Sequence, residues 1–332
     1  MIKLIAETAW HHEGDVNFLK QQVKNISHNP NVDIIKLHIT LDLEEYMTKC
    51  HPVYKTLSNW MISEDHWEKV IQIIKKSGKK LLLLLNDTKA IAFAKKFNPE
   101  YIEVHSVAVN VPRFSREIAN NFEISTGIFI GVGGCTLEEI DHAYETYKDY
   151  DPIMMFGFQN YPTQYKSINL SKVQKLQRLY KNARYGYADH CSWDEKHNEL
   201  ITLMVASNNM DFIEKHVTLF PGVERCDYSA AIAIEQLNEL SAKLKILDEL
   251  KSDGKMSLNV GEIAYSKYGP MKMAPLLMND VQAGKSLKLN DIDFKRTSEA
   301  SDISQLDIYN FIGKPLTESL YNGKVLMRTD FE

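Results

Sequence analysis

The sequence predicts an α/β fold, a (β/α)8 TIM barrel followed by a small C-terminal domain. Short apolar runs alternate eight times with longer amphipathic segments over about 250 residues, which is the element count of such a barrel. The first turn, at residues 9–14, lacks the G-x-G-x-x-G pattern that a doubly wound nucleotide-binding sheet would carry. After Lys251 the apolar runs shorten and turns become frequent, which indicates a separate, smaller unit.

Eight apolar runs are predicted as strands because each is short and bounded by polar or turn residues. In chain order they are 3–6, 34–38, 80–85, 101–105, 127–132, 153–158, 183–187 and 210–215. Helices are predicted between these strands and after the last one, among them 15–26, 63–77, 87–97, 111–121, 136–147, 172–179 and 231–250. Asp15 is the expected N-cap of the first helix.

The polar stretch 251–255 marks the expected end of the barrel. We predict a barrel domain at residues 1–252, a linker at 253–273 and a small domain at 274–332. A domain of about 60 residues is near the lower limit for independent stability, so we expect it to pack on a barrel.

The composition is that of a globular protein, with 44% hydrophobic residues and a net charge of −5. This acidic balance argues against nucleic-acid binding, which needs a basic surface. The longest apolar run, 81–85, is far shorter than the roughly 20 residues of a membrane span, and no signal-peptide pattern opens the chain. Four scattered cysteines fit a reducing compartment. We therefore expect a cytoplasmic protein that binds neither nucleic acid nor membrane.

Polar residues follow several predicted strands, and in a barrel these ends form the face that carries the chemistry. His190 and His216 each come directly after an apolar strand. Their side chains could converge on a metal that keeps positions open for water and substrate. Asp189 and Glu214 are candidates for positioning roles. Two histidines on unrelated loops are the alternative interpretation.

Further candidates follow the first two strands. Glu7 could act as a general base, and His12 in the next turn could bind an anion or a sugar. Lys36 and His38 end the second strand, and we expect only one of them to face the barrel mouth. Lys36 could form a Schiff base with a carbonyl substrate, although an anion-binding role is favoured. The glycine turn 131–134 could cradle a phosphate or serve close packing.

These residues resemble, in order along the chain, the motifs of the sialic acid synthase family, which makes nine-carbon 2-keto sugar acids. The matching stretches are I-A-E at 5–7, H-E-G-D at 12–15, D-I-I-K at 33–36, Y-P-T at 161–163, G-Y-A-D-H at 186–190 and E-K-H-V-T-L at 214–219. Residues 287–296 and 313–314 resemble the antifreeze-like (SAF, β-clip-type) domain that these enzymes append to the barrel.

The resemblance implies that His190 and His216 bind a divalent metal, Mn²⁺ or Mg²⁺, and that Glu7 is a catalytic carboxylate. We expect Lys36, in the matching second-strand motif, to be catalytic as well. The resemblance also implies a domain-swapped homodimer in which Arg296 reaches the sugar site of the partner protomer. The other residues expected to contact a sugar-like substrate are His12, His38, Ser106, Gln159, Tyr161, Asp189 and Asp227.

The family's phosphoenolpyruvate side is altered in this sequence. The hydroxyl-bearing S-T-P-F of the third strand is replaced by L-L-L-N at 83–86, and a family lysine aligns with Glu103. A carboxylate at Glu103 would repel a phosphate group.

Two enzymatic hypotheses follow. The first is a divergent synthase that condenses a three-carbon donor, phosphoenolpyruvate in the family, with a sugar aldehyde. The second is a metal-dependent lyase, aldolase or hydratase that acts on a related sugar acid without phosphoenolpyruvate. A non-catalytic sugar-binding protein is disfavoured because Glu7, His190, His216, Asp227 and Arg296 are all retained.

Overall fold

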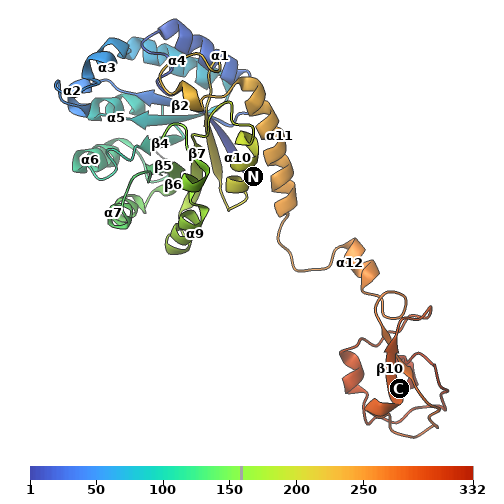
Figure 1. Cartoon of the computed structure of the whole chain (residues 1–332). Coiled ribbons are helices and arrows are strands. Elements are labelled where there is room, and N and C mark those ends of the chain that lie inside the picture. The colour runs from blue at the N-terminus through green and yellow to red at the C-terminus, as the bar shows by residue number, and fades with distance from the viewer. Residues whose placement is uncertain (158–159, 332) are drawn as a thin grey trace. The chain divides into compact units, whose positions relative to one another are not determined.

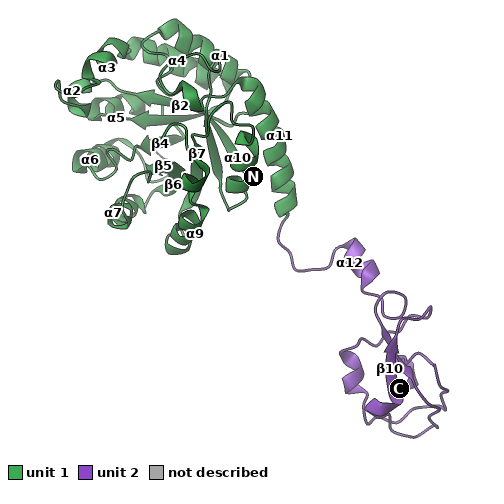
Figure 2. Cartoon of the chain, viewed as in Figure 1, with its two compact units in different colours: residues 1–252 green, residues 253–332 purple. Residues whose placement is uncertain are grey.

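The computed structural model describes residues 1–157 and 160–331. The chain forms two compact units, Met1–Ser252 and Asp253–Glu332, which Figure 2 colours separately.

Unit 1 is a closed barrel of eight parallel strands that pair in sequence order (Figure 1). The strands are β1 (Lys3–Glu7), β2 (Ile34–Ile39), β3 (Lys80–Leu85), β4 (Tyr101–Val104), β5 (Gly127–Gly131), β6 (Asp151–Gly157), β7 (Arg184–Asp189) and β8 (Phe212–His216). The predicted (β/α)8 barrel is confirmed. Strands β7 and β8 run further than predicted because their pairing continues, with Asp189 opposite Lys215 and Glu7 opposite His216.

Helices cover the outside of the barrel. The longer ones are α1 (Val16–Ser27), α4 (Glu64–Ser77), α5 (Thr88–Lys95), α6 (Pro112–Asn121), α7 (Leu137–Tyr147), α9 (Leu170–Leu179), α10 (Asn198–Ala206) and α11 (Ile234–Lys251). Asp15 caps α1 as predicted. Short helices α2 (Leu43–Tyr46), α3 (Tyr54–Trp60) and α8 (Tyr165–Ile168) and the 3-10 turn Tyr228–Ala230 lie in the connections. Helix α3 was not predicted, because it buries none of its residues and so has no apolar period.

Alternate residues of each strand point into the barrel, and they form layers. An apolar cluster fills the barrel interior and consists of Ile5, Ile34, Leu82, Tyr101, Phe129, Ile153, Met155, Ala188 and Phe212. Two residues further along four of these strands stand the charged side chains Glu7, Lys36, Glu103 and Glu214. A histidine follows after two more residues on three strands, at His38, His105 and His216. The barrel therefore has a dry floor beneath a charged layer and a rim of imidazoles.

The intervening residues of β7 and β8 face outward and attach these strands to α10. Lys215 Nζ lies 2.7 Å from Asp189 Oδ2 and 2.6 Å from Asn198 Oδ1. The other Asp189 oxygen accepts from the Cys191 amide at 2.9 Å. Asp189 and Lys215 are each 1% exposed. This ion pair stands directly beside His190 and His216 and holds the strand ends that carry them.

Unit 2 contains helix α12 (Val260–Tyr265), the antiparallel strands β9 (Ala274–Leu277) and β10 (Ile292–Lys295), and short 3-10 turns at Leu289–Asp291, Asp307–Asn310 and Arg328–Asp330. Its core is formed by Leu277, Leu287, Ile292, Ile303, Ile308, Phe311, Leu316, Leu320 and Leu326. Helix α12 lies within the stretch predicted as a linker. It buries none of its residues, so the sequence has no apolar period there that would predict a helix. The antifreeze-like identity of this unit stays a prediction.

None of the described helices has the length and apolar character that a membrane crossing requires.

We predict that Lys215→Met destabilises the barrel by about 3–5 kcal/mol, because it leaves the buried Asp189 carboxylate without its cation. Urea unfolding followed by tryptophan fluorescence measures this, since Trp10, Trp60, Trp67 and Trp193 all belong to unit 1. The control is Lys3→Met, which removes the half-exposed Lys3–Asp33 pair and should cost less than about 1 kcal/mol. Equal losses of unfolding free energy in the two variants would show that the Lys215–Asp189 pair does not hold the strand ends.

Candidate active site at the barrel mouth

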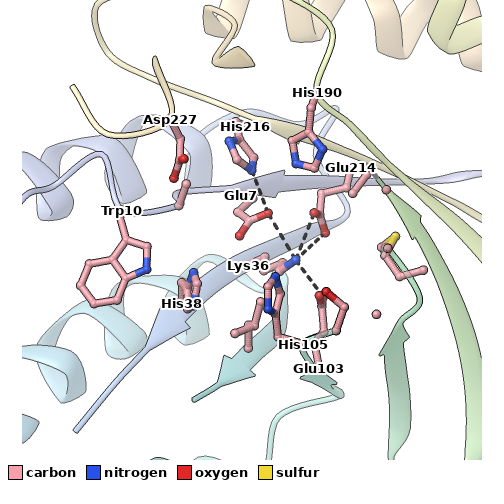
Figure 3. Close-up of a pocket in the computed structure, with 18 of the residues that line it drawn as sticks. Glu7, Trp10, Lys36, His38, Glu103, His105, His190, Glu214, His216 and Asp227 are labelled. Atoms are coloured by element: carbon pink, nitrogen blue, oxygen red, sulfur yellow. Dashed lines mark hydrogen bonds and ion pairs between the residues drawn. The ribbon is translucent and has the colours of Figure 1, made fainter. Parts of the chain in front are cut away.

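A cavity of about 300 Å³ opens above the charged layer, at the carboxyl ends of the strands (Figure 3). It is lined by residues from all eight barrel strands and from the connections that follow them. The polar and aromatic ones are Glu7, Trp10, Lys36, His38, Tyr46, Glu103, His105, Ser106, Tyr161, His190, Glu214, His216 and Asp227.

Most of the residues singled out in the sequence come together in this cavity. Those that line it are Glu7, Lys36, His38, Ser106, Tyr161, His190, His216 and Asp227. The expectation that only one of Lys36 and His38 faces the mouth is wrong, because residues two apart in a strand point to the same side. Gln159 lies outside the described residues.

Three predicted contacts are placed elsewhere. Asp189 points away from the cavity and is satisfied by Lys215, Thr202 and the Cys191 amide, so the prediction that it contacts a substrate is wrong. His12 is fully buried between Trp10 and Trp67, and it does not line the cavity.

Arg296 belongs to unit 2, where its guanidinium donates to the Pro270 carbonyl. Its expected role in the sugar site of a partner protomer stays a prediction.

The centre of the site is one ammonium group shared by three carboxylates. Lys36 Nζ lies 3.3 Å from Glu7 Oε2, 2.8 Å from Glu103 Oε2 and 3.0 Å from both oxygens of Glu214. Dashed lines in Figure 3 mark these contacts. All four side chains are almost fully buried. The network therefore sits in a low-dielectric environment where charge interactions are strong.

Burial by itself would lower the pKa of Lys36. The attraction of Glu103, Glu214 and Glu7 outweighs burial and raises the Lys36 pKa well above its ordinary value. Lys36 is therefore an ammonium ion at neutral pH. A Schiff base requires a neutral amine, so the charge of Lys36 argues against that role.

The carboxylates that share Lys36 differ in their charge. Burial raises the pKa of Glu7, but Lys36 and His216 outweigh it and hold the Glu7 pKa well below its usual range. Burial, assisted by the nearby Glu7 and Glu103, raises the pKa of Glu214 well above its usual range. Burial also raises the pKa of Glu103, against the attraction of Lys36. Neighbouring carboxyl groups with opposed shifts are the pattern of an acid and base pair.

His190 and His216 meet at the cavity wall as the sequence suggested. Their ring centroids are 5.0 Å apart and the rings are nearly perpendicular. His216 Nε2 lies 3.3 Å from Glu7 Oε2, and His190 Nε2 lies 3.3 Å from the Tyr161 hydroxyl. Burial lowers the pKa of His190 to about 3. Burial also lowers that of His216, but Glu7 outweighs it and raises the pKa.

The two imidazoles fit the donor chemistry of a divalent metal site. Among the residues that the structure describes, the buried Nδ1 atoms of His190 and His216 have no hydrogen-bond partner, and imidazole nitrogen is a common ligand of transition metals. Among the described residues, no cluster of three or more His, Cys, Asp or Glu side chains is arranged to hold an ion. The described residues thus offer two ligands, and other positions would be left for water or substrate.

Aromatic and loop residues complete the mouth. The Trp10 ring lies 5.4 Å from the His38 ring, edge to face, and the Tyr161 ring lies 4.6 Å from the His190 ring. Asp227 has a left-handed φ of 61° beside Cys226, whose amide donates to Glu13 at 2.8 Å. This bond attaches the Asp227 loop to the turn after β1.

Some site residues were missed or only partly recognised in the sequence. The sequence suggests a positioning role for Glu214 but not its contact with Lys36, and it presents Glu103 only as a substitution of a family lysine. Both lie two residues before a histidine, at His216 and His105. That spacing places them on the inward face and could have identified them. Trp10 follows β1 in a loop, where no periodic signal exists.

We predict that borohydride reduction in the presence of pyruvate leaves Lys36 unmodified at neutral pH, because its amine is held protonated. Mass spectrometry of the peptide that contains Lys36 measures this, with an aldolase of the Schiff-base class as the positive control. A reduced pyruvyl adduct on Lys36 would show that the three carboxylates do not fix its charge.

Comparisons with known proteins agree with this fold. A sequence model described as the NeuB family matches residues 23–256. An uncharacterized protein of Methanocaldococcus jannaschii is 21% identical over 308 residues, which are 92% of this chain and 88% of that protein.

Solved structures show the same fold at low identity. A spore coat polysaccharide biosynthesis protein E of Chromobacterium violaceum has a TM-score of 0.84 at 16% identity, covering 100% of both chains. An N-acetylneuraminic acid synthetase of Leptospira borgpetersenii, in complex with citrate, has a TM-score of 0.71 at 19% identity over 80% of this chain and 90% of that one. The family match spans well over half of the sequence, and this chain belongs to the NeuB family.

Proposed function

We propose that this NeuB-family chain is a carbohydrate-acid synthase that joins a three-carbon donor to a sugar aldehyde. The observation that carries the proposal is the position of Glu7. Its carboxylate touches both Lys36 and His216 at the floor of a cavity whose wall holds the His190–His216 pair. Family membership and the likeness to an N-acetylneuraminic acid synthetase support the sugar-acid class.

The proposed roles follow from charge and position. His190 and His216 would hold a divalent metal, Mn²⁺ or Mg²⁺. When bound, the metal would supply Lewis-acid polarisation of the aldehyde oxygen. Glu7, ionised beside the Lys36 ammonium, would move a proton at the reacting carbon or oxygen. Tyr161, His38 and Asp227 line the cavity and would position sugar hydroxyls.

A second candidate is a metal-dependent lyase, aldolase or hydratase on a related sugar acid, without phosphoenolpyruvate. The observation that favours it is that three acidic side chains already share the one ammonium group among the described residues of the deep cavity. A phosphate charge about 4 Å from an ionised carboxylate is repelled by about 4 kcal/mol at an effective dielectric constant of about 20.

We predict that His190→Ala and His216→Ala each weaken Mn²⁺ binding by at least about tenfold, because each would remove a proposed ligand. Calorimetric titration of the chelator-treated protein measures this binding without an activity assay. The control is His142→Ala, which changes an exposed histidine on α7. Wild-type affinity in both site variants would exclude this pair as the metal site.

Turnover tests the function itself. We expect the Mn²⁺-loaded protein to form a 2-oxo sugar acid from an amino-sugar aldehyde and either phosphoenolpyruvate or pyruvate, detected by mass spectrometry. Glu7→Gln should slow the reaction by about 10²–10⁴-fold, because it removes the proposed proton-transfer group. Release of pyruvate from a sugar acid, with no phosphate involved, would favour the second candidate. No product in either direction across the panel would contradict both.

A further inference from the structure

On the side of β2, β3 and β4, the described residues of the cavity leave no cation free for an anionic ligand. Among the described residues that line the cavity, Lys36 is the only lysine or arginine. It faces Glu7, Glu103 and Glu214, each within 3.3 Å of its ammonium.

An ammonium group has three N–H donors. Three carboxylates surround Lys36, and Glu214 presents both of its oxygens to it at 3.0 Å. A phosphoryl group could reach Lys36 only by displacing one of these buried partners. The displaced carboxylate would then be left without a cation in a dry environment, which is strongly unfavourable.

The imidazoles on this side do not supply the missing charge. His38 Nε2 is engaged by the Asn86 amide at 2.6 Å. The His105 ring lies 6.1 Å from the His38 ring. Burial lowers the pKa of His38 to about 3 and that of His105 to about 4, so both are neutral at pH 7. They can exchange hydrogen bonds with a ligand, but they cannot balance a phosphate dianion.

We infer that Glu103 is a specificity-determining residue that excludes phosphoryl groups, and that the three-carbon substrate is a 2-oxo monocarboxylate such as pyruvate. This inference rests on the proposed function, and it holds for the condensing and the cleaving direction. Glu103 is the member of the network from β4 and borders the half of the cavity that contains His38 and His105.

The chemistry of such a donor balances without phosphate. The methyl carbon of pyruvate loses a proton and forms a carbon–carbon bond to the aldehyde carbon, and the aldehyde oxygen gains a proton. No group leaves and no water is consumed. Pyruvate carries one negative charge, whereas phosphoenolpyruvate carries up to three, so the repulsion from Glu103 is much smaller.

The test compares the affinities of two ligands in Glu103→Gln and in the wild-type protein, by calorimetry with Mn²⁺ present. We expect Glu103→Gln to bind phosphoenolpyruvate at least about tenfold more tightly than the wild type, because a neutral amide replaces the carboxyl group that occupies the Lys36 ammonium at 2.8 Å. The affinity for pyruvate should change much less. Inorganic phosphate should follow phosphoenolpyruvate. The matched control is Glu68→Gln, the same substitution on the exposed face of α4.

Wild-type protein that binds phosphoenolpyruvate as tightly as Glu103→Gln would overturn the inference, and so would equal gains for both ligands. Tight binding of phosphoenolpyruvate by the wild-type protein would point to the backbone amides of the 131–134 turn as a phosphate site. Glu103→Ser is a second variant, and its folding is checked by tryptophan fluorescence. It should show the same gain in phosphoenolpyruvate affinity as Glu103→Gln. The ratio of the phosphoenolpyruvate affinities of Glu103→Gln and the wild type is measured without turnover. Failure of this inference and failure of the proposed function are therefore distinguishable.

Discussion

The ammonium group of Lys36, enclosed by the carboxylates of Glu7, Glu103 and Glu214, is the contact on which the candidate site depends. Beneath it lies an apolar layer in which Tyr101, Phe129 and Phe212 pack edge to face. The charges therefore cannot be solvated from below, and each must find its partner within the layer. Four strands are tied together across the barrel interior by this requirement, which also fixes where each carboxylate can stand.

The same network divides the cavity into two sides with different chemistry. On the side of β1, β7 and β8, Glu7 is ionised and faces two imidazoles that fit a divalent metal. On the side of β2 to β4, Glu103 and neutral histidines leave a surface that suits hydroxyl groups better than phosphate. The outward ion pair of Lys215 and Asp189 holds the strand ends that carry the imidazole pair. Along the ends of β7 and β8, outward residues that stabilise the barrel therefore alternate with inward residues that line the cavity.

The barrel was predictable because apolar strands and amphipathic helices leave a periodic signal, and so was the approach of His190 to His216, since parallel strands end at one face. The strand period of two residues also places Lys36 and His38 on the same face. The expectation that they point to opposite sides applied this period wrongly. The outward turn of Asp189 follows from the same alternation once Ala188 and His190 point inward. Trp10 in a loop, and helices α3 and α12 with no buried residues, carried no such signal. The pKa shifts depend on contacts between strands far apart in the sequence, such as that of Lys36 with Glu214, and no local pattern encodes them.

The most direct test of the central role of Lys36 is a double-mutant cycle between Lys36→Met and Glu103→Gln, measured as unfolding free energy by tryptophan fluorescence. Lys36→Met alone should lower the unfolding free energy by about 3–5 kcal/mol, because it leaves buried carboxyl groups without their cation. Glu103→Gln introduced into that background should recover part of the loss, because one uncompensated charge is removed, so the two effects should be strongly non-additive. Effects that add within about 0.5 kcal/mol would contradict the account, because they would show that Lys36 and Glu103 do not interact.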